Sequence, residues 1–218
     1  MFRIFTTLSL LVGVLLCTNL ALGLSIGKYN RVARKWIAAR HDLAKLSPGS
    51  DEQATATAKL RLERSWDLLR PIEQKKRWHV WSGIGVTLIV LLLNSLTVTY
   101  FIGTSRWCQE VADAYGAGHE LVKQSVHLKR SNFPWALSST VCLLVIIGLG
   151  AASDLTANFN SAEDFVVPHS IAATLGTLWI IWSFRAQARK LAENQLLINR
   201  VLQLVKEIQS DCVHSASE

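Results

Sequence analysis

The side chains best placed for chemistry are two histidines, each at the start of a long apolar run. His79 precedes one run and His169 opens another. Both runs are expected to cross a membrane in the same direction, so both imidazoles would lie near the same membrane face. Two imidazoles at one depth on two helices can be the axial ligands of a b-type haem. Gly83 and Ala173, one turn after each histidine, are small enough to leave room for a porphyrin.

A simpler interpretation of the same histidines stays open. His79 follows three basic residues, 75–77, in a position typical of the lipid headgroup region. His169 follows Pro168 and could bond backbone or water at a helix start. His119 and His127 are eight residues apart, too far to share one metal on a straight helix, so we interpret them as surface residues.

A second set of side chains follows the apolar run after His79. Tyr100, Arg106 and Trp107 could line a pocket for a quinone or a lipid headgroup at the opposite membrane face. Anchoring is the simpler role, because Trp favours the headgroup level, where its ring is in apolar surroundings and its N–H remains hydrated.

Composition places the chain among membrane proteins. Half of the 218 residues are hydrophobic and only 18% are charged. The net charge of +7 is what the flanks of membrane helices carry, so we predict a lipid bilayer and not nucleic acid as the partner. The four cysteines form no C-x-x-C motif. No sequence motif of a known catalytic site is present, which favours a non-enzymatic protein.

Four apolar runs must position these residues, because about 20 apolar residues span the hydrocarbon core as a helix. The runs at 5–24, 82–102, 133–153 and 166–184 contain no Asp, Glu, Lys or Arg, which disfavours an ion-coupled transporter. The first run also resembles a secretory signal, and its length favours a retained helix. The predicted segments are a first transmembrane helix at 1–24, a basic helical hairpin at 25–81, a second transmembrane helix at 82–102, a short helical connection at 103–132, a third transmembrane helix at 133–153, an acidic loop at 154–165, a fourth transmembrane helix at 166–184 and an amphipathic heptad tail at 185–218.

The segments outside the apolar runs have helical patterns. In the hairpin, residues 47–50 predict a turn, with Ser50 or Asp51 as the cap of the next helix. In the tail, apolar residues recur at heptad spacing, with Asn194 within the stripe. Two interpretations stay open for the tail, a coiled coil with a second subunit or packing against residues 106–132 of the same chain.

The charges give contradictory predictions of orientation. Thirteen Lys and Arg between residues 24 and 81 favour the cytoplasm for that segment, whereas the acidic loop has no basic residue and favours the outside. Four crossings put both on the same side. The basic flanks of the third and fourth runs favour both termini in the cytoplasm.

The stretch Val98-Thr-Tyr-Phe-Ile-Gly-Thr-Ser-Arg-Trp-Cys-Gln-Glu-Val111, with Leu128-Lys-Arg-Ser-Asn-Phe-Pro-Trp-Ala136, resembles a family of uncharacterised bacterial multi-helix inner-membrane proteins. The resemblance implies a bacterial inner-membrane location and no known activity. Within this stretch we predict that a helix ends at Gly103 and that Thr104 or Ser105 caps the next one.

The sequence therefore predicts an all-α integral membrane protein with four spanning helices. The leading functional hypothesis is a non-enzymatic subunit or scaffold of a larger membrane complex, held by other subunits or by self-association through the heptads. The alternatives are a b-type haem electron carrier that uses His79 and His169, and a quinone-binding or lipid-binding protein.

Overall fold

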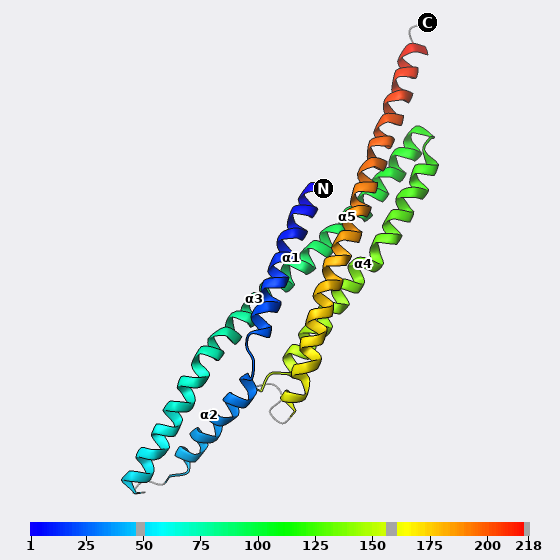
Figure 1. Cartoon of the computed structure of the whole chain (residues 1–218). Coiled ribbons are helices and arrows are strands. Elements are labelled where there is room, and N and C mark those ends of the chain that lie inside the picture. The colour runs from blue at the N-terminus through cyan, green and yellow to red at the C-terminus, as the bar shows by residue number, and fades with distance from the viewer. Residues whose placement is uncertain (47–50, 156–160, 216–218) are drawn as a thin grey trace. The chain divides into compact units, whose positions relative to one another are not determined.

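The structure, a computed structural model, describes residues 1–46, 51–155 and 161–215. These residues form five α-helices and no β-strand, which confirms the all-α prediction (Figure 1). The helices are α1 (Phe2–Leu24), α2 (Tyr29–Ala44), α3 (Glu52–Tyr115), α4 (His119–Ala152) and α5 (Ala162–Ser215).

The chain forms two compact units, and four of the five helices contribute to both. Unit 1 contains Met1–Val14, Thr87–Leu144 and Gly176–Glu218. Unit 2 contains Leu15–Val86 and Val145–Leu175, and therefore all of α2. The two units are described separately below.

Four helices, α1, α3, α4 and α5, are long and apolar enough to cross a membrane. Each includes an 18-residue window with a mean hydropathy of 1.5 to 2.0. Large apolar side chains are exposed along them, including Leu10, Leu88 and Leu175. In water such surface would be costly, whereas lipid tails can cover it, so the described helices fit a multi-pass membrane protein.

Helix α3 is longer than the sequence predicts. It continues through Gly103 to Tyr115, so the predicted helix end at Gly103 and the new cap at Thr104 or Ser105 are wrong. The Thr104 hydroxyl donates a hydrogen bond to the Tyr100 carbonyl four residues earlier (2.9 Å), as in a helix interior. The turn comes at Gly116 and Gly118, whose φ angles of 63° and 83° favour glycine.

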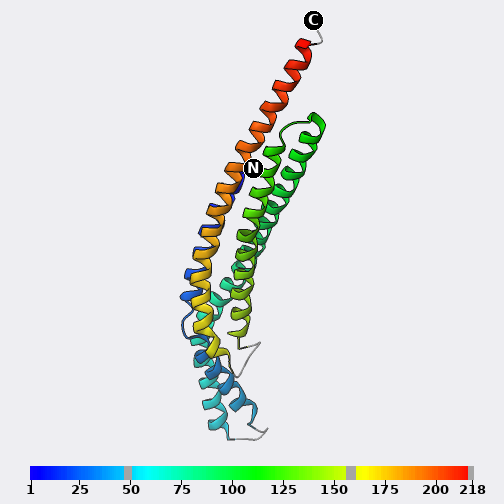
Figure 2. The same cartoon turned by 90° about the vertical axis from the view of Figure 1, so that its right-hand side faces the viewer.

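The C-terminal part of α5 packs against its own chain within unit 1. Leu197 and Val201 form a buried cluster with Cys108 of α3, and Leu121 of α4 packs against it. Figure 2 shows this part of α5 beside the α3–α4 turn. Of the two interpretations of the heptad stripe, the structure shows packing within the chain. These residues are therefore not free to form a coiled coil with a second subunit.

We expect Leu197→Ala to destabilise unit 1 by about 2–4 kcal/mol, because the substitution leaves a cavity in this cluster. Leu202→Ala is the matched control, since Leu202 lies on the same helix but is exposed. Thermal unfolding in detergent, followed by circular dichroism, measures both variants. Equal losses of stability would show that the buried contacts of Leu197 do not stabilise the tail.

In unit 2, α2 lies beside the first turns of α3 (Figure 1), where the ring centroids of Trp36 and Trp66 are 5.7 Å apart. Asp51 caps α3, because its Oδ1 accepts a hydrogen bond from the Gln53 N–H (3.2 Å). The predicted turn at 47–50, with Ser50 as the alternative cap, lies outside the described residues.

Opposite charges within unit 2 explain the contradictory charge pattern of the sequence. Lys76 Nζ lies 3.0 Å from Asp154 Oδ2, and Arg34 Nε lies 3.5 Å from Glu163 Oε1. The Asn30 amide also donates to the Ser153 carbonyl (3.1 Å). The acidic segment at 154–165 therefore partly neutralises the basic segment at 25–81, which lies at the same end of unit 2. The charge of the acidic segment is thus not an independent indicator of membrane orientation.

We expect a double-mutant cycle on Lys76→Met and Asp154→Asn to give a coupling on the order of 1 kcal/mol, because both side chains are largely buried. The control is the exposed pair Lys123 and Glu120, for which we expect less than about 0.5 kcal/mol. Unfolding free energies of the single and double variants give both couplings. A Lys76–Asp154 coupling no larger than that of the control would contradict a structural role for the pair.

Candidate functional site

The two histidines singled out by the sequence lie together inside unit 2. The ring centroids of His79 on α3 and His169 on α5 are 6.4 Å apart, and the ring planes are inclined by 67°. Both rings are half-buried. Ninety residues separate them in the sequence, so the tertiary fold alone creates this pair.

Each ring is fixed through the same nitrogen. His79 Nδ1 lies 3.1 Å from the Asn19 carbonyl oxygen on α1, and His169 Nδ1 lies 3.1 Å from the Ile146 carbonyl oxygen on α4. A carbonyl oxygen can only accept, so in both hydrogen bonds Nδ1 must donate its proton. The neutral ring then has an unprotonated Nε2, whose lone pair is available for a metal.

A glycine faces each ring at close range. A Cβ added at Gly23 would lie 2.7 Å from His79 Cε1, and one at Gly150 would lie 3.0 Å from His169 Cε1. Gly23 comes four residues after Asn19, whose carbonyl holds the His79 ring. Gly150 likewise comes four residues after Ile146, whose carbonyl holds the His169 ring. Both histidines therefore occupy the same kind of half-site, built from one helical turn of a neighbouring helix. These turns could not be predicted from the sequence, because a Gly in an apolar helix carries no functional signal until its neighbour is known.

The space predicted beside His79 at Gly83 is taken by another side chain. A Cβ at Gly83 would lie 3.3 Å from the Asn19 amide nitrogen, so Gly83 makes room for Asn19 and not for a porphyrin. The Asn19 Oδ1 accepts a hydrogen bond from the Ser82 hydroxyl (2.7 Å). Asn19 thus contacts α3 through both its side chain and its backbone.

The side chains of unit 2 at the level of the histidines are partly exposed. Leu16 and Val86, one to two turns away, are buried, as are Leu69 and Leu155 toward the other end of the unit. Between these layers the side chains are only half-buried, and this set includes Asn19, His79, Ser82, His169, Ala172 and Ala173. The edge of this layer is therefore accessible from the surface of the helices.

The kind of metal site is limited by the number of protein ligands. Within the described residues, no group of three or more His, Cys, Asp or Glu side chains could hold a metal ion. A pair of imidazoles cannot make a closed four-ligand site with protein groups alone. It does suffice for haem, whose porphyrin supplies four nitrogens and leaves two axial positions.

The second predicted site is less convergent. Arg106 is 81% exposed and pairs with Glu110 one turn along α3, with Nε 2.9 Å from Oε1. Trp107 packs against the buried cluster of Cys108, Leu197 and Val201. Tyr100 contacts Phe101 edge-on, with ring centroids 5.9 Å apart. The guanidinium thus has a partner on the surface and Trp107 has a packing role.

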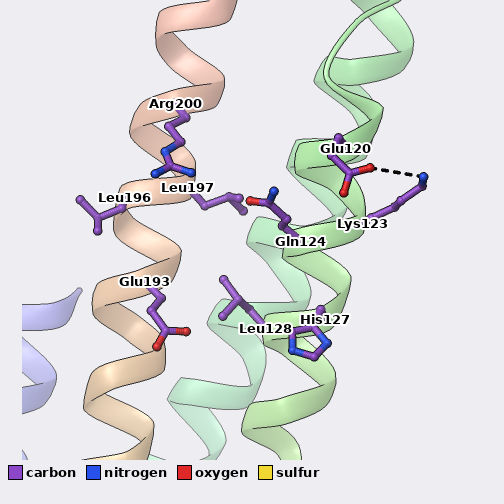
Figure 3. Close-up of a pocket in the computed structure, with 9 residues that line it drawn as sticks. All are labelled: Glu120, Lys123, Gln124, His127, Leu128, Glu193, Leu196, Leu197 and Arg200. Atoms are coloured by element: carbon purple, nitrogen blue, oxygen red, sulfur yellow. Dashed lines mark ion pairs between the residues drawn. The ribbon is translucent and has the colours of Figure 1, made fainter.

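Unit 1 contains a surface cavity of about 490 Å³ between α4 and α5 (Figure 3). Two of its lining residues, Leu128 and Leu197, are buried leucines. The cavity also has charged side chains of both signs, and Lys123 Nζ lies 3.3 Å from Glu120 Oε2. The lining residues are Glu120, Lys123, Gln124, His127, Leu128, Glu193, Leu196, Leu197 and Arg200. His127 is exposed here, in agreement with its interpretation as a surface residue. The mixed charges favour no single ligand charge.

Hydrogen bonds between buried side chains join α3, α4 and α5 in unit 1. The Asn94 amide donates to the hydroxyls of Ser139 (2.8 Å) and Thr140 (3.0 Å), and its Oδ1 accepts from Gln187 Nε2 (3.1 Å). Gln187 was not among the predicted functional residues, because it follows the predicted fourth span. Its signal was the spacing of Ser183, Gln187 and Asn194, which fall on one face of a helix.

No family model matches the chain, and comparisons with curated proteins and with solved structures also give no match. The fold therefore defines the class, an α-helical protein with four helices able to cross a membrane, and the function must be argued from the site.

Proposed function

We propose that this chain is a membrane protein that binds one b-type haem between His79 and His169 in unit 2. The observation that carries the proposal is the matched geometry of the two rings, each held through Nδ1 by a backbone carbonyl and each backed by a glycine. A hydrogen bond from Nδ1 to a carbonyl is the usual support of an imidazole that binds a metal through Nε2.

The separation of the rings supports the proposal. Two imidazole nitrogens about 2 Å on either side of a metal, each roughly 1 Å from its own ring centre, put the ring centres about 6 Å apart. The centroids here are 6.4 Å apart.

The surroundings suit electron transfer. His79 and His169 would together hold the haem iron, and the chemistry that the haem would supply is electron transfer. Bound haem would supply a reversible one-electron change of its iron, with the electron received from and returned to other one-electron carriers. The residues of this chain would hold the iron at a fixed depth.

On the aqueous side of the histidines, access of water would be limited by the ion pairs of Lys76 and Arg34 and by the buried Ala33 and Leu155. Tyr29 packs against the cluster of Ala33 and Leu155. Its burial, and to a smaller extent its hydrogen bond to Glu73, raises its pKa, so its phenol stays neutral.

The test is the absorption spectrum of the full chain, expressed with an adequate haem supply and purified in mild detergent. We expect a Soret band and, after reduction with dithionite, the sharp α and β bands of low-spin six-coordinate haem, with about one haem per chain by the pyridine haemochrome assay. Purified protein without a Soret band after haem-replete expression would refute the proposal.

A second candidate function is a non-enzymatic subunit or scaffold of a membrane complex. It is favoured by apolar side chains outside the predicted spans, Leu60 and Leu68, which are 55% and 66% exposed on one side of α3. Exposed leucines between basic residues suit contact with another protein subunit. Native mass spectrometry in gentle detergent tests this role, and a strictly monomeric protein without bound partners would contradict it.

In either role we place the protein in a bacterial inner membrane with both termini in the cytoplasm. The basic flanks of the third and fourth apolar runs support this orientation. A quinone or lipid headgroup site at Tyr100, Arg106 and Trp107 stays a prediction, supported by the exposed Arg106 next to Trp107.

A further inference from the structure

Among the residues that the structure describes in unit 1, three buried carboxamide oxygens have no hydrogen-bond donor. They are Asn132 Oδ1 on α4 and Gln187 Oε1 and Asn194 Oδ1 on α5. The three residues are 1%, 0% and 0% exposed. A buried acceptor without a donor loses its hydrogen bonds to water and gains none in return, so such groups are rare in folded proteins.

Exchanging the oxygen and nitrogen of an amide does not remove the deficit. Gln187 Nε2 donates to Asn94 Oδ1 (3.1 Å) and to the Ser183 hydroxyl (3.3 Å), so the exchange would leave Asn94 without its donor. Asn194 Nδ2 donates to the Thr104 hydroxyl (3.1 Å), whose own proton is given to the Tyr100 carbonyl (2.9 Å). Exchanging Asn94 and Gln187 together would keep the bond between them, but a buried polar atom of Gln187 and one of Asn194 would still lie where the structure shows no partner. The missing partners are therefore not found among the described side chains.

We propose that the interior of unit 1 binds internal water molecules that donate to these oxygens. Water is small, donates twice and accepts twice, and it typically bonds two to four buried polar groups. Hydroxyl groups lie beside the amides that need donors, Ser183 beside Gln187 and Thr104 beside Asn194, and can serve as further partners.

One bound cation would not satisfy all three oxygens. Gln187 and Asn194 are seven residues apart on α5, which is about 10 Å along the helix, so they cannot be ligands of the same ion. A hard cation also needs about six oxygen ligands. Separate water molecules, one beside Gln187 and one beside Asn194, fit the distance between these residues along α5. Leu191, which lies between them on the helix, is buried.

The experiment is hydroxyl-radical labelling of the full chain in detergent by short X-ray pulses in H₂¹⁸O, with the labelled residues identified by mass spectrometry. Radicals form from water at the site, so a buried side chain is labelled only where water is bound next to it. We expect Leu191, one turn from both Gln187 and Asn194, to be labelled several-fold faster than Val90 and Ile180. Those two controls are fully buried in the same unit and have no unpartnered oxygen one turn away.

Equal labelling of Leu191 and the two controls would overturn the proposal. Replacing sodium by choline in the buffer should leave the labelling unchanged, and a change would make sodium the occupant instead of water. The variant Asn194→Leu should reduce labelling at Leu191, because it removes one of the anchoring oxygens. Should that variant fail to fold, the comparison of Leu191 with Val90 and Ile180 in the native chain still decides.

Discussion

His79→Ala and His169→Ala should each abolish the low-spin haem spectrum of the purified protein. Each removes one of the two imidazoles whose centroids lie 6.4 Å apart in unit 2. Loss of one axial ligand leaves five-coordinate, high-spin haem or none at all, and loss of both removes the haem. We expect haem content per chain to fall at least about tenfold in the double variant, since the described residues contain no group of three or more His, Cys, Asp or Glu that could hold the iron instead.

The control for these variants is His127→Ala. His127 is exposed in unit 1, in the wall of the α4–α5 cavity (Figure 3), so its loss should leave the spectrum unchanged. Helix content by circular dichroism separates loss of haem from loss of fold. A wild-type haem spectrum in either His79→Ala or His169→Ala would exclude that residue as an axial ligand.

Gly23→Ala and Gly150→Ala should each displace the adjacent imidazole and shift the haem midpoint potential or lower haem occupancy. The new methyl group would lie 2.7 Å from the His79 ring or 3.0 Å from the His169 ring, closer than side-chain carbons normally approach. The ring must then move away from the carbonyl that holds Nδ1, which weakens the hydrogen bond that orients the ligand. We expect the larger effect at Gly23, where the approach is closer.

Two other glycines in unit 2 provide matched controls. Gly85 on α3 and Gly148 on α4 have no atom within 4 Å of an added Cβ. Gly85→Ala and Gly148→Ala should leave the spectrum and the potential unchanged and should stabilise their helices slightly, by up to about 1 kcal/mol. If all four alanine variants bind haem with the same potential, the glycines do not position the histidines.

The sequence carries the strongest signals where a physical requirement is local. An apolar run must form a helix in a bilayer to satisfy its own backbone, so the helices with runs at 5–24, 82–102, 133–153 and 166–184 could be predicted from composition alone. Glycine is the local signal for a positive φ angle, as Gly116 and Gly118 show. The turn at these residues was nevertheless not predicted, because Gly103 gave a competing signal for the end of the helix.

The candidate site was predictable only in part. The sequence placed His79 and His169 at comparable depths, since each begins an apolar run, but the groups that fix the rings belong to other helices. The Asn19 carbonyl and Gly23 are on α1, and Ile146 and Gly150 are on α4. A backbone carbonyl and a glycine carry no chemical signature in a sequence, so only the tertiary structure shows their role.

By itself, then, the sequence determined the helical class, the long apolar segments and the two histidines that could act at one level. Tertiary structure decided which surfaces those helices share. It turned the heptad stripe of α5 inward onto Cys108 and Leu121, and it paired the acidic segment with Lys76 and Arg34. Helix formation depends on neighbours within a few residues, whereas these contacts join residues far apart in the chain, whose meeting depends on how whole helices pack.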